Sequence, residues 1–351
     1  MFRVPTSVFA AGAMILSLAG GSVHADYSAH PAGKAFAERM LTEHGMPLAD
    51  TQDLLSGVSR YDAVIEAMSR PAEKTLTWAD YRPIFLKADR AEQGAAFYRE
   101  HRPVFDAAAS RYGVPAEIIT AIIGVESRFG RYKGKHPALQ SLATLAFDYP
   151  PRSAFFTSEL EHFLLLSREE GLDPLSVKGS YAAAMGMPQF ISSSYRAYAV
   201  DGDGDGQRDL FNNIDDVVHS VANYFARHGW RPDEPVTTVA APNGDVAALS
   251  KKGYKPTLSA ADLDAVGVAV ESVKGNEYAL IRLRGANGDE HWVGYPNFYV
   301  ITRYNHSPLY AMAVFQLAQA IKKTLDSNSA HSGSDVSLQL AHTSQLNLGT
   351  D

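Results

Sequence analysis

The chain has 351 residues, of which 46% are hydrophobic and 10% aromatic, so it can bury the core of one large domain or of two or three smaller ones. A formal net charge of -7 and the absence of a basic run argue against a nucleic-acid-binding protein. Because the chain has no cysteine, disulfides, thiolate metal sites, cysteine catalysis and a lipid-modified N-terminal cysteine are all excluded.

The first 25 residues are typical of a cleaved secretory signal peptide. Arg3 lies near the start, an apolar run covers residues 8–19, and Val23 and Ala25 occupy the positions that a signal peptidase recognises. The run is shorter than the roughly 20 residues that a membrane span requires. We therefore expect a mature chain that begins at Asp26 and a soluble protein of the periplasm.

Helical spacing of apolar residues predicts several helices between residues 31 and 110. The periodic residues are Phe36, Met40 and Leu41 in one segment, and Tyr61, Val64, Ile65 and Met68 in the next. A longer helix is predicted from about Glu92 to Tyr112. Just before it, residues 78–85 combine aromatic side chains with Arg82, as the wall of a ligand groove does, although ordinary packing explains them equally well.

Residues 113–130 are predicted to form the helix on which the functional interpretation depends. Offsets of four and seven residues place Glu126 on the apolar face that Ile119 and Ile123 would turn inward. Gly130 can end the helix in a left-handed backbone conformation. The pattern thus predicts one carboxyl group at the end of an otherwise apolar helix.

A carboxyl group in that position has a chemical and a structural interpretation. Partial desolvation disfavours the charged form and raises the pKa, so Glu126 could act as a general acid near neutral pH. Alternatively, Glu126 lies at the rim of a core helix and pairs with Arg128 or Arg131.

Two further helices are predicted over residues 139–146 and 155–170. The stretch that follows, residues 180–195, contains small residues that allow backbones to approach closely. Ser180, Gln189 and Tyr195 could present hydrogen-bonding groups to a polar ligand. A tightly packed helix start, with serines as caps, is the structural alternative.

An acidic, glycine-rich segment follows. Asp201, Asp203 and Asp205 alternate with glycine, and Gly206 comes next. This is the opening of an EF-hand-type calcium loop, in which oxygen ligands converge and the glycine at the sixth position allows a sharp turn.

The end of this loop departs from the pattern. The twelfth position, where an EF-hand carries a bidentate glutamate, is Asn212. Asp215 or Asp216 could supply the missing carboxylate in a longer loop. An acidic surface turn is the alternative, although three carboxylates this close repel one another without a cation.

After a helix predicted over residues 216–228, the apolar period changes to that of strands. Residues 277–285 and 291–295, joined by Asn287-Gly288, indicate a β-hairpin, and a short helix is predicted near Ser259. We interpret this region as a small β-containing insertion.

The C-terminal region is predicted to contain one helix and a tail. The helix begins at Tyr304 and runs to about Leu325. Residues 326–351 are polar and rich in Ser, Asn and Gln, which predicts a mobile tail.

Several chemistries lack their sequence motifs. The chain has no HExxH, GxSxG, P-loop or dinucleotide-binding motif. The functions that remain are carboxylate chemistry on an uncharged ligand, or binding alone. Glycoside cleavage suits these residue types, because an acid protonates the leaving oxygen while aromatic and amide groups hold the sugar. No comparable second carboxylate lies in a nearby motif; a single-carboxylate route would suit an N-acetylated sugar whose own groups capture the cation.

Five segments, in order, resemble the lytic murein transglycosylase B family. They are residues 125–130 (VESRFG), 180–190 (SYAAAMGMPQF), 195–201 (YRAYAVD), 220–225 (SVANYF) and 301–310 (ITRYNHSPLY). The resemblance extends from about Phe36 to Leu325.

The resemblance implies an α+β fold that is mainly α. It comprises a lysozyme-like core over residues 113–230, a helical domain over 26–112 completed by a C-terminal helix at 304–325, and a small β domain over 231–303.

The resemblance also implies a lyase that acts on peptidoglycan. In this family a glutamate that matches Glu126 protonates the oxygen between N-acetylmuramic acid and N-acetylglucosamine. It then takes the proton from the muramoyl 6-hydroxyl, which attacks the anomeric carbon. The product ends in a 1,6-anhydro sugar, no water is consumed, and the substrate's acetamido group helps to stabilise the cationic intermediate.

Further site residues follow from the match to the family's motifs. The implied sugar-binding positions are Ser180, Gln189, Tyr224, Tyr304, Asn305 and Tyr310, with Tyr81 as a further wall residue. The implied calcium ligands are Asp201, Asp203, Asp205 and the backbone of Gln207, closed by Asp215 or Asp216. Calcium would be structural, and no organic cofactor is implied. Peptidoglycan strands are the expected partner, other cell-wall enzymes are candidate partners, and we expect a monomer.

Two departures and two competing hypotheses qualify this interpretation. Ala183 stands where relatives commonly have glycine, and residues 191–194 (ISSS) replace Met-Pro-Ser-Ser. Both changes concern turnover and specificity more than the class of reaction. The competing hypotheses are a lysozyme-type hydrolase, which would leave a reducing sugar, and a calcium-stabilised peptidoglycan-binding protein that has lost activity.

Overall fold

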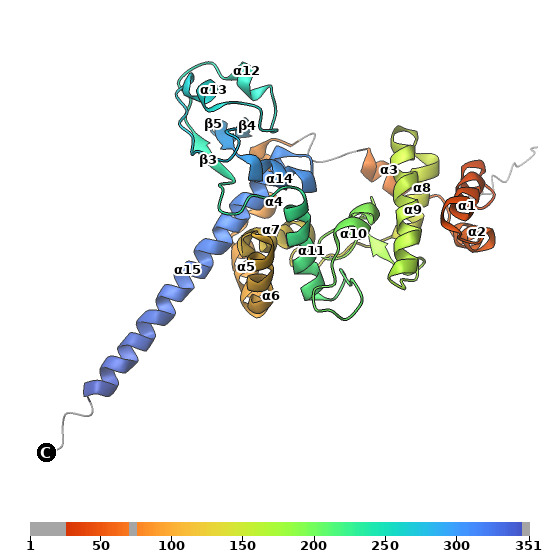
Figure 1. The fold of residues 1–351 in the computed structure, drawn as a ribbon, viewed down its shortest axis with the longest axis horizontal. Coiled ribbons are helices and arrows are strands. Elements are labelled where there is room, and N and C mark those ends of the chain that lie inside the picture. The colour runs from red at the N-terminus through yellow and green to blue at the C-terminus, as the bar shows by residue number, and fades with distance from the viewer. Residues whose placement is uncertain (1–25, 70–75, 346–351) are drawn as a thin grey trace, which may run out of the picture.

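The computed structural model describes residues 26–69 and 76–345, and side chains up to residue 327. The predicted signal peptide, residues 1–25, lies outside the described residues. The described chain is mostly helical and carries two small antiparallel sheets (Figure 1). The predicted mainly helical α+β fold class is confirmed.

The elements follow the chain in this order. The first helices are α1 (Pro31–His44), α2 (Leu48–Ser56), α3 (Asp62–Met68), α4 (Trp78–Phe85), α5 (Ala88–Glu100), α6 (Arg102–Tyr112) and α7 (Ala116–Ser127). The middle of the chain forms β1 (His136–Pro137), α8 (Ala138–Asp148), the 3-10 turn η2 (Pro150–Arg152), α9 (Ser153–Glu169), β2 (Lys178–Gly179), α10 (Ser192–Tyr198) and α11 (Ile214–Arg227). The last elements are β3 (Thr237–Ala240), α12 (Ala247–Ser250), α13 (Ala260–Asp264), β4 (Ala279–Gly285), β5 (Gly288–Gly294), α14 (Pro296–Tyr304) and α15 (Pro308–Gln345).

The buried helix α7 lies at the centre of the molecule. It packs against α5, α6, α11 and α15 (Figure 1). Ile118, Ile119, Ile122 and Ile123 are all at most 3% exposed, and a helix that is apolar on every side is stable only when it is covered on every side. Burying each isoleucine contributes about 1.5–3 kcal/mol. This burial holds the C-terminal end of α7, where Glu126 lies, in a fixed position.

The N-terminal helices form a separate group with α8 and α9. α1 packs on α2, and α3 packs on α8. Tyr27 is fully buried, and its hydroxyl donates to Asp148 Oδ2 at 2.6 Å. His44 at the end of α1 reaches Glu161 of α9 at 3.0 Å.

The predicted helical domain over residues 26–112 is therefore divided in the structure. In its first part, α1 contacts α9 through Arg39 and His44, and α3 contacts α8. By contrast, α4 and α5 contact α15, and α6 contacts α7 and α11. The physical reason is that the apolar faces of the first helices find their partners on helices far along the chain.

The long helix predicted from Glu92 to Tyr112 is broken. α5 ends at Glu100, and α6 begins at Arg102 with Pro103 in its first turn. A proline has no N–H to donate to the carbonyl four residues earlier, so one helix cannot pass through this position.

Three strands form the small β region, with the order β3-β5-β4. The predicted hairpin is confirmed as β4 and β5, but Gly285 pairs with Gly288, so the turn residues are Ala286 and Asn287 and not Asn287-Gly288. Gly288 has a φ of 116°, which glycine tolerates. The predicted short helix is α13, which Ser259 caps through the N–H of Asp262.

The last helix differs from its prediction at both ends. Tyr304 ends α14, a short connection follows, and α15 begins at Pro308. α15 continues to Gln345, well past Leu325, and extends away from the body of the molecule (Figure 1). A mobile tail was predicted over residues 326–351, whereas the backbone is helical as far as Gln345. Among the helices of the described chain, none combines the length and the apolar content that crossing a membrane would require.

Candidate active site

Glu126 lies in the last turn of α7, and the backbone turns sharply after it. The helix ends at Ser127, earlier than the predicted end at Gly130. Arg128, Phe129 and Gly130 then have φ values of 52°, 58° and 79°, and the N–H of Gly130 donates to Ser127 Oγ at 3.0 Å. A left-handed conformation costs a residue with a side chain about 1–2 kcal/mol. Such strain is found preferentially at functional sites, and here it follows Glu126 directly.

The side chain of Arg128, one of the two predicted partners of Glu126, contacts other residues. Its guanidinium group lies 3.3 Å from Asp89 and donates to Gln93 at 3.2 Å. These two contacts hold Arg128 against α5.

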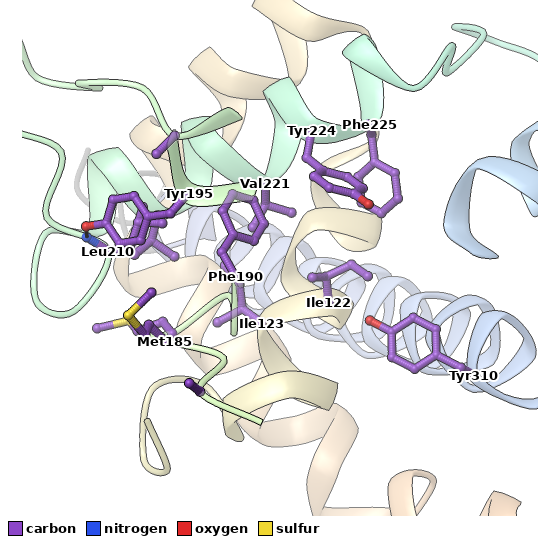
Figure 2. Packing of buried hydrophobic residues seen from close by; sticks show 14 of the residues in the cluster. Ile122, Ile123, Met185, Phe190, Tyr195, Leu210, Val221, Tyr224, Phe225 and Tyr310 are labelled. Atoms are coloured by element: carbon purple, nitrogen blue, oxygen red, sulfur yellow. Dashed lines mark hydrogen bonds between the residues drawn. The ribbon is translucent and has the colours of Figure 1, made fainter. Parts of the chain in front are cut away.

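Tyr310 of α15 contacts Glu126 directly. Its hydroxyl donates to Glu126 Oε1 at 2.5 Å, and Figure 2 shows this hydroxyl pointing toward α7 near Ile122. Ser307, just before α15, accepts a hydrogen bond from the N–H of Tyr310 at 3.3 Å and so fixes the first turn of the helix. Tyr310 is 2% exposed.

The protonation of Tyr310 follows from its surroundings. Burial raises the pKa of Tyr310 well above its ordinary value, and the negative charge of Glu126 raises it further. Tyr310 therefore remains a hydrogen-bond donor at all physiological pH values.

Two more tyrosines surround the same carboxylate. The ring of Tyr304 stacks on that of Tyr310 at 6.4 Å, and Tyr224 lies 4.8 Å from Tyr304. Burial raises the pKa of both Tyr304 and Tyr224, and the charge of Glu126 contributes in each case. The structure thus brings together three of the predicted sugar-binding residues and Glu126, although they come from four different helices.

Backbone carbonyls fix the two tyrosyl hydroxyls. Tyr304 donates to the carbonyl of Pro188 at 2.7 Å, and Tyr224 donates to the carbonyl of Arg303 at 2.6 Å. The first bond ties α14 to the 180–190 segment. Phe190, at the end of that segment, contacts the rings of both tyrosines, and Figure 2 shows it beside Val221 of α11.

His228 and Tyr198 belong to this cluster but were not predicted from the sequence. The ring of His228 stacks on Tyr224 at 4.0 Å, and Tyr198 lies 4.9 Å from each of them. His228 follows Tyr224 by four residues and caps the C-terminal end of α11, a spacing that could have identified it. The position of Tyr198, on α10, depends on tertiary packing.

Ser180 and Gln189 are engaged within their own segment. Ser180 Oγ accepts hydrogen bonds from the N–H groups of Ala182 and Ala184 at 3.3 and 3.1 Å. Gln189 has a φ of 53°, and its Nε2 donates to the carbonyl of Gly186 at 2.9 Å. Both side chains shape the loop that approaches Tyr304.

The two departures from the family pattern lie at conformationally special positions. Ala183 has a φ of 59° and is 1% exposed, and glycine adopts this backbone conformation without strain. Ser192 is the first residue of α10, where proline is favoured.

Tyr81 and Asn305 complete the predicted sugar-binding set. Tyr81 lies on α4 and is 3% exposed, and α4 packs against α15, the helix that carries Tyr310. Asn305 is half-buried in the connection between α14 and α15, next to Tyr304.

The predicted calcium loop brings three carboxylates together. Asp201, Asp203 and Asp205 each offer one oxygen within 4.8 Å of the others. Gly204 and Gly206, with φ values of 82° and 92°, allow the tight turn that this requires. Hard carboxylate oxygens in such a loop are the ligands that calcium prefers.

Asp216 and Asp215 lie outside that group of three. Both oxygens of Asp216 already accept backbone hydrogen bonds, from Gly202 at 2.7 Å and from Asp209 at 2.6 Å. Burial raises the pKa of Asp216 to about 6, and the nearby charges of Asp203 and Asp201 also raise it. Asp216 thus closes the loop through the backbone, with both of its carboxylate oxygens engaged.

Tyr195 has a structural role in the same region. It is 1% exposed, its hydroxyl donates to the carbonyl of Arg208 and accepts from the N–H of Leu210, and Figure 2 shows it beside Leu210. The suggestion that Tyr195 presents a group to a ligand is therefore wrong, because its hydroxyl is used to hold the acidic loop on α10.

Comparison with known proteins agrees with this architecture. Residues 28–319 match the family model described as the transglycosylase SLT domain. The chain is 42% identical to the membrane-bound lytic murein transglycosylase B of Escherichia coli over 307 residues, 84% of each chain.

Solved structures of similar proteins show the same fold. The soluble lytic transglycosylase SltB1 of Pseudomonas aeruginosa has a TM-score of 0.79 at 46% identity, over 84% of this chain and 99% of that one. E. coli Slt35 in complex with calcium has a TM-score of 0.78 at 41% identity, over 86% and 95%. P. aeruginosa SltB3 has TM-scores of 0.73 with NAG-NAM-pentapeptide and 0.71 with NAG-anhNAM-pentapeptide, at 30% identity over 83% of this chain and 79% and 78% of those. The chain therefore belongs to the transglycosylase SLT-domain family of lytic murein transglycosylases.

Proposed function

We propose that this protein is a lytic transglycosylase that cleaves peptidoglycan between N-acetylmuramic acid and N-acetylglucosamine without water. The hydrogen bond between Glu126 and the buried hydroxyl of Tyr310 carries this proposal. It orients a single carboxyl group, at the end of a rigid helix, within a cluster of tyrosines. A general acid must be held in this way to protonate a glycosidic oxygen.

In the proposed reaction Glu126 acts twice. Its proton passes to the glycosidic oxygen as the bond to the anomeric carbon breaks, and N-acetylglucosamine leaves with a free hydroxyl. The resulting carboxylate then takes the proton of the muramoyl 6-hydroxyl while that oxygen bonds to the anomeric carbon. Glu126 ends protonated, so the cycle is complete, and the product is a 1,6-anhydro sugar.

Tyr310 would hold Glu126 through both steps, since its hydroxyl donates to Glu126 Oε1. Tyr304, which is half-buried, would offer its ring to the sugars, and the buried Tyr224 and Tyr81 would support the wall of the site. Asn305, Gln189 and Ser180 would shape the polar part of the site. The complex of the relative SltB3 with NAG-anhNAM-pentapeptide favours the anhydro product over the reducing sugar of a lysozyme-type hydrolase.

We also propose a structural calcium ion in the loop of Asp201, Asp203 and Asp205, with the backbone of Gln207 and the carboxylate of Asp215. The three clustered carboxylates support it, as does the calcium complex of the relative Slt35. The ion would neutralise the mutual repulsion of the carboxylates and stabilise the loop.

Export to the periplasm through residues 1–25 is part of the same proposal and rests on the sequence pattern.

The experiment that tests the reaction is mass spectrometry of the muropeptides released from purified peptidoglycan. The mature protein should release products one water lighter than those of a hydrolase, and Glu126→Gln should release none. Products with reducing ends would establish hydrolysis. No release by either protein would favour a binding protein that has lost activity.

A further inference from the structure

A cavity of about 520 Å³ lies between the segment that follows Glu126 and the acidic loop. Its walls come from four parts of the chain: residues 133–134, residues 170–172, residues 176–178, and residues 207–209 with 211–212. A volume of this size suits a small ligand or a few residues of a peptide. None of the residues proposed above to contact the sugars lines it.

Close backbone contact places two lysines at this cavity. A Cβ atom on Gly134 would lie 2.1 Å from the carbonyl carbon of Gly179, so the two segments touch where neither has a side chain. Lys133 and Lys178, each the residue before one of these glycines, both line the cavity. In the described part of the chain, neither ammonium group has a carboxylate within ion-pair distance.

The other charges of the cavity are engaged. Arg208 is paired with Glu170, whose two oxygens accept from its side chain and from its N–H. Asp209 accepts from the N–H groups of Phe211 and Asn212 at 2.7 and 3.1 Å. With Lys133, Lys178 and Arg208 against Glu170 and Asp209, the lining of the cavity carries one more positive charge than negative.

The environment of each lysine indicates an anionic ligand. Lys133 Nζ donates to the carbonyl of Phe211 at 2.7 Å and to Asn212 Oδ1 at 3.2 Å, which positions it without neutralising it. Lys178 is exposed. Leu172, Val177 and Phe211 add an apolar wall, which suits short aliphatic side chains better than a sugar ring.

We infer that this cavity binds the peptide part of peptidoglycan, through a peptide carboxylate held between Lys133 and Lys178. The inference rests on the proposed function, because it takes the substrate to be a glycan that carries peptides, like the NAG-NAM-pentapeptide bound by the relative SltB3. The segment that carries Lys133 begins directly after α7, where the N–H of Tyr132 donates to the carbonyl of Ser127 at 2.9 Å. Peptide binding at this cavity would thus add affinity for substituted strands.

Titration calorimetry with the free pentapeptide, in calcium-containing buffer, tests the inference without any turnover. The peptide with free carboxylates should bind, and the same peptide with its carboxylates amidated should bind at least about tenfold more weakly. Lys178→Gln should weaken binding about threefold and the double variant with Lys133→Gln about tenfold, since exposed charge pairs contribute modestly. Lys178→Arg should restore binding.

The matched control is Lys34→Gln, which removes an exposed lysine of α1 away from the cavity. It should bind the peptide as the wild type does. Lys178 is exposed, so its variant keeps the test valid even if Lys133→Gln impairs folding.

Three results would overturn the inference: no binding of the acidic peptide, equal binding by Lys178→Gln, or displacement by acetate at the peptide's own concentration, which would indicate a general anion site. Because the assay needs no cleavage, a failure of peptide binding is distinct from a failure of the lyase assay with Glu126.

Discussion

At the scale of single residues, the Glu126–Tyr310 contact is the feature most open to test. A hydrogen bond to a charged group contributes about 1.5–3 kcal/mol. Tyr310→Phe removes the hydroxyl and keeps the ring that stacks on Tyr304. We expect the variant to fold and to lose about tenfold or more in kcat/KM for peptidoglycan cleavage, since Glu126 is no longer held in one orientation.

The control for this variant is Tyr278→Phe. Tyr278 is 1% exposed, and its hydroxyl donates to the carbonyl of Glu271 at 3.1 Å in the β region. Tyr278→Phe removes a comparable buried hydroxyl that lies in another part of the molecule from Glu126, so it should leave peptidoglycan cleavage unchanged. Equal activity of Tyr310→Phe and the wild type would contradict the positioning role.

Ala183 provides a second test at this scale. The left-handed backbone of Ala183 costs the folded state about 1–2 kcal/mol. A glycine avoids this strain, but it loses more backbone entropy on folding than alanine does, which costs about 0.5–1 kcal/mol. Ala183→Gly should therefore raise the free energy of unfolding by about 0.5–1 kcal/mol, measured by urea denaturation. Ala184→Gly, at the next residue, relieves no left-handed backbone strain and should lower the free energy of unfolding by a similar amount. Destabilisation by both substitutions would contradict the strain at Ala183.

At the scale of elements, the acidic loop and α11 form one unit. Asp216, in the first turn of α11, accepts from the N–H of Gly202 at the loop's start and from that of Asp209 near its end. The N-cap of α11, Asn213, also donates to Asp203 Oδ2 at 2.9 Å. Since α11 carries Tyr224, order in the loop is coupled to one wall of the candidate active site.

Calcium removal tests this unit. When the free calcium concentration is about 100 times the Kd of the folded loop, calcium binding adds about 2.7 kcal/mol to the free energy of unfolding. EDTA should then lower Tm by about 3–8 °C in a thermal melt, and added calcium should restore it. Asp203→Asn should make Tm insensitive to EDTA, whereas Asp50→Asn, at an exposed aspartate of α2, should retain the full shift. Equal Tm values with and without EDTA in the wild type would contradict the calcium proposal.

At the scale of the whole molecule, stability should depend on pH through buried histidines. Burial lowers the pKa values of His136, His219 and His228. For His228 the charge of Arg303 lowers the pKa further, although its hydrogen bond with the Tyr224 carbonyl acts in the opposite direction. Below the unfolded value of about 6.5, the unfolded chain binds protons more readily than the folded one. The contribution of these histidines to the free energy of unfolding is therefore fully present above pH 6.5. It is lost as the pH falls through their lower pKa values in the folded protein.

The contribution of His228 can be isolated by substitution. His228→Asn removes the titrating ring and keeps an amide that can donate to Tyr224. Between pH 7.5 and pH 5, the free energy of unfolding of the wild type should fall more steeply than that of the variant, measured by urea denaturation with calcium present. Parallel curves would show that His228 does not take part in this dependence.

Much of the local structure and chemistry could be predicted from the sequence. The period of apolar residues located α7, α9, α11 and the β4–β5 hairpin, because those patterns depend on neighbours within a few residues. The Asp-Gly alternation identified the acidic loop for the same reason. Errors occurred at boundaries: Pro103 divides a predicted helix, and Tyr304 ends one helix where the next was predicted to begin.

The sequence by itself thus determined which segments are helices, which carboxylates cluster, and that one glutamate ends an apolar helix. Only the tertiary structure decided that Tyr310, 184 residues away in the chain, holds Glu126. It also decided that α1 contacts α9, that α3 packs on α8, and that Lys133 and Lys178 share a cavity. The physical reason is that hydrogen bonding along the backbone is local, whereas the burial of apolar faces selects partners among all segments of the chain.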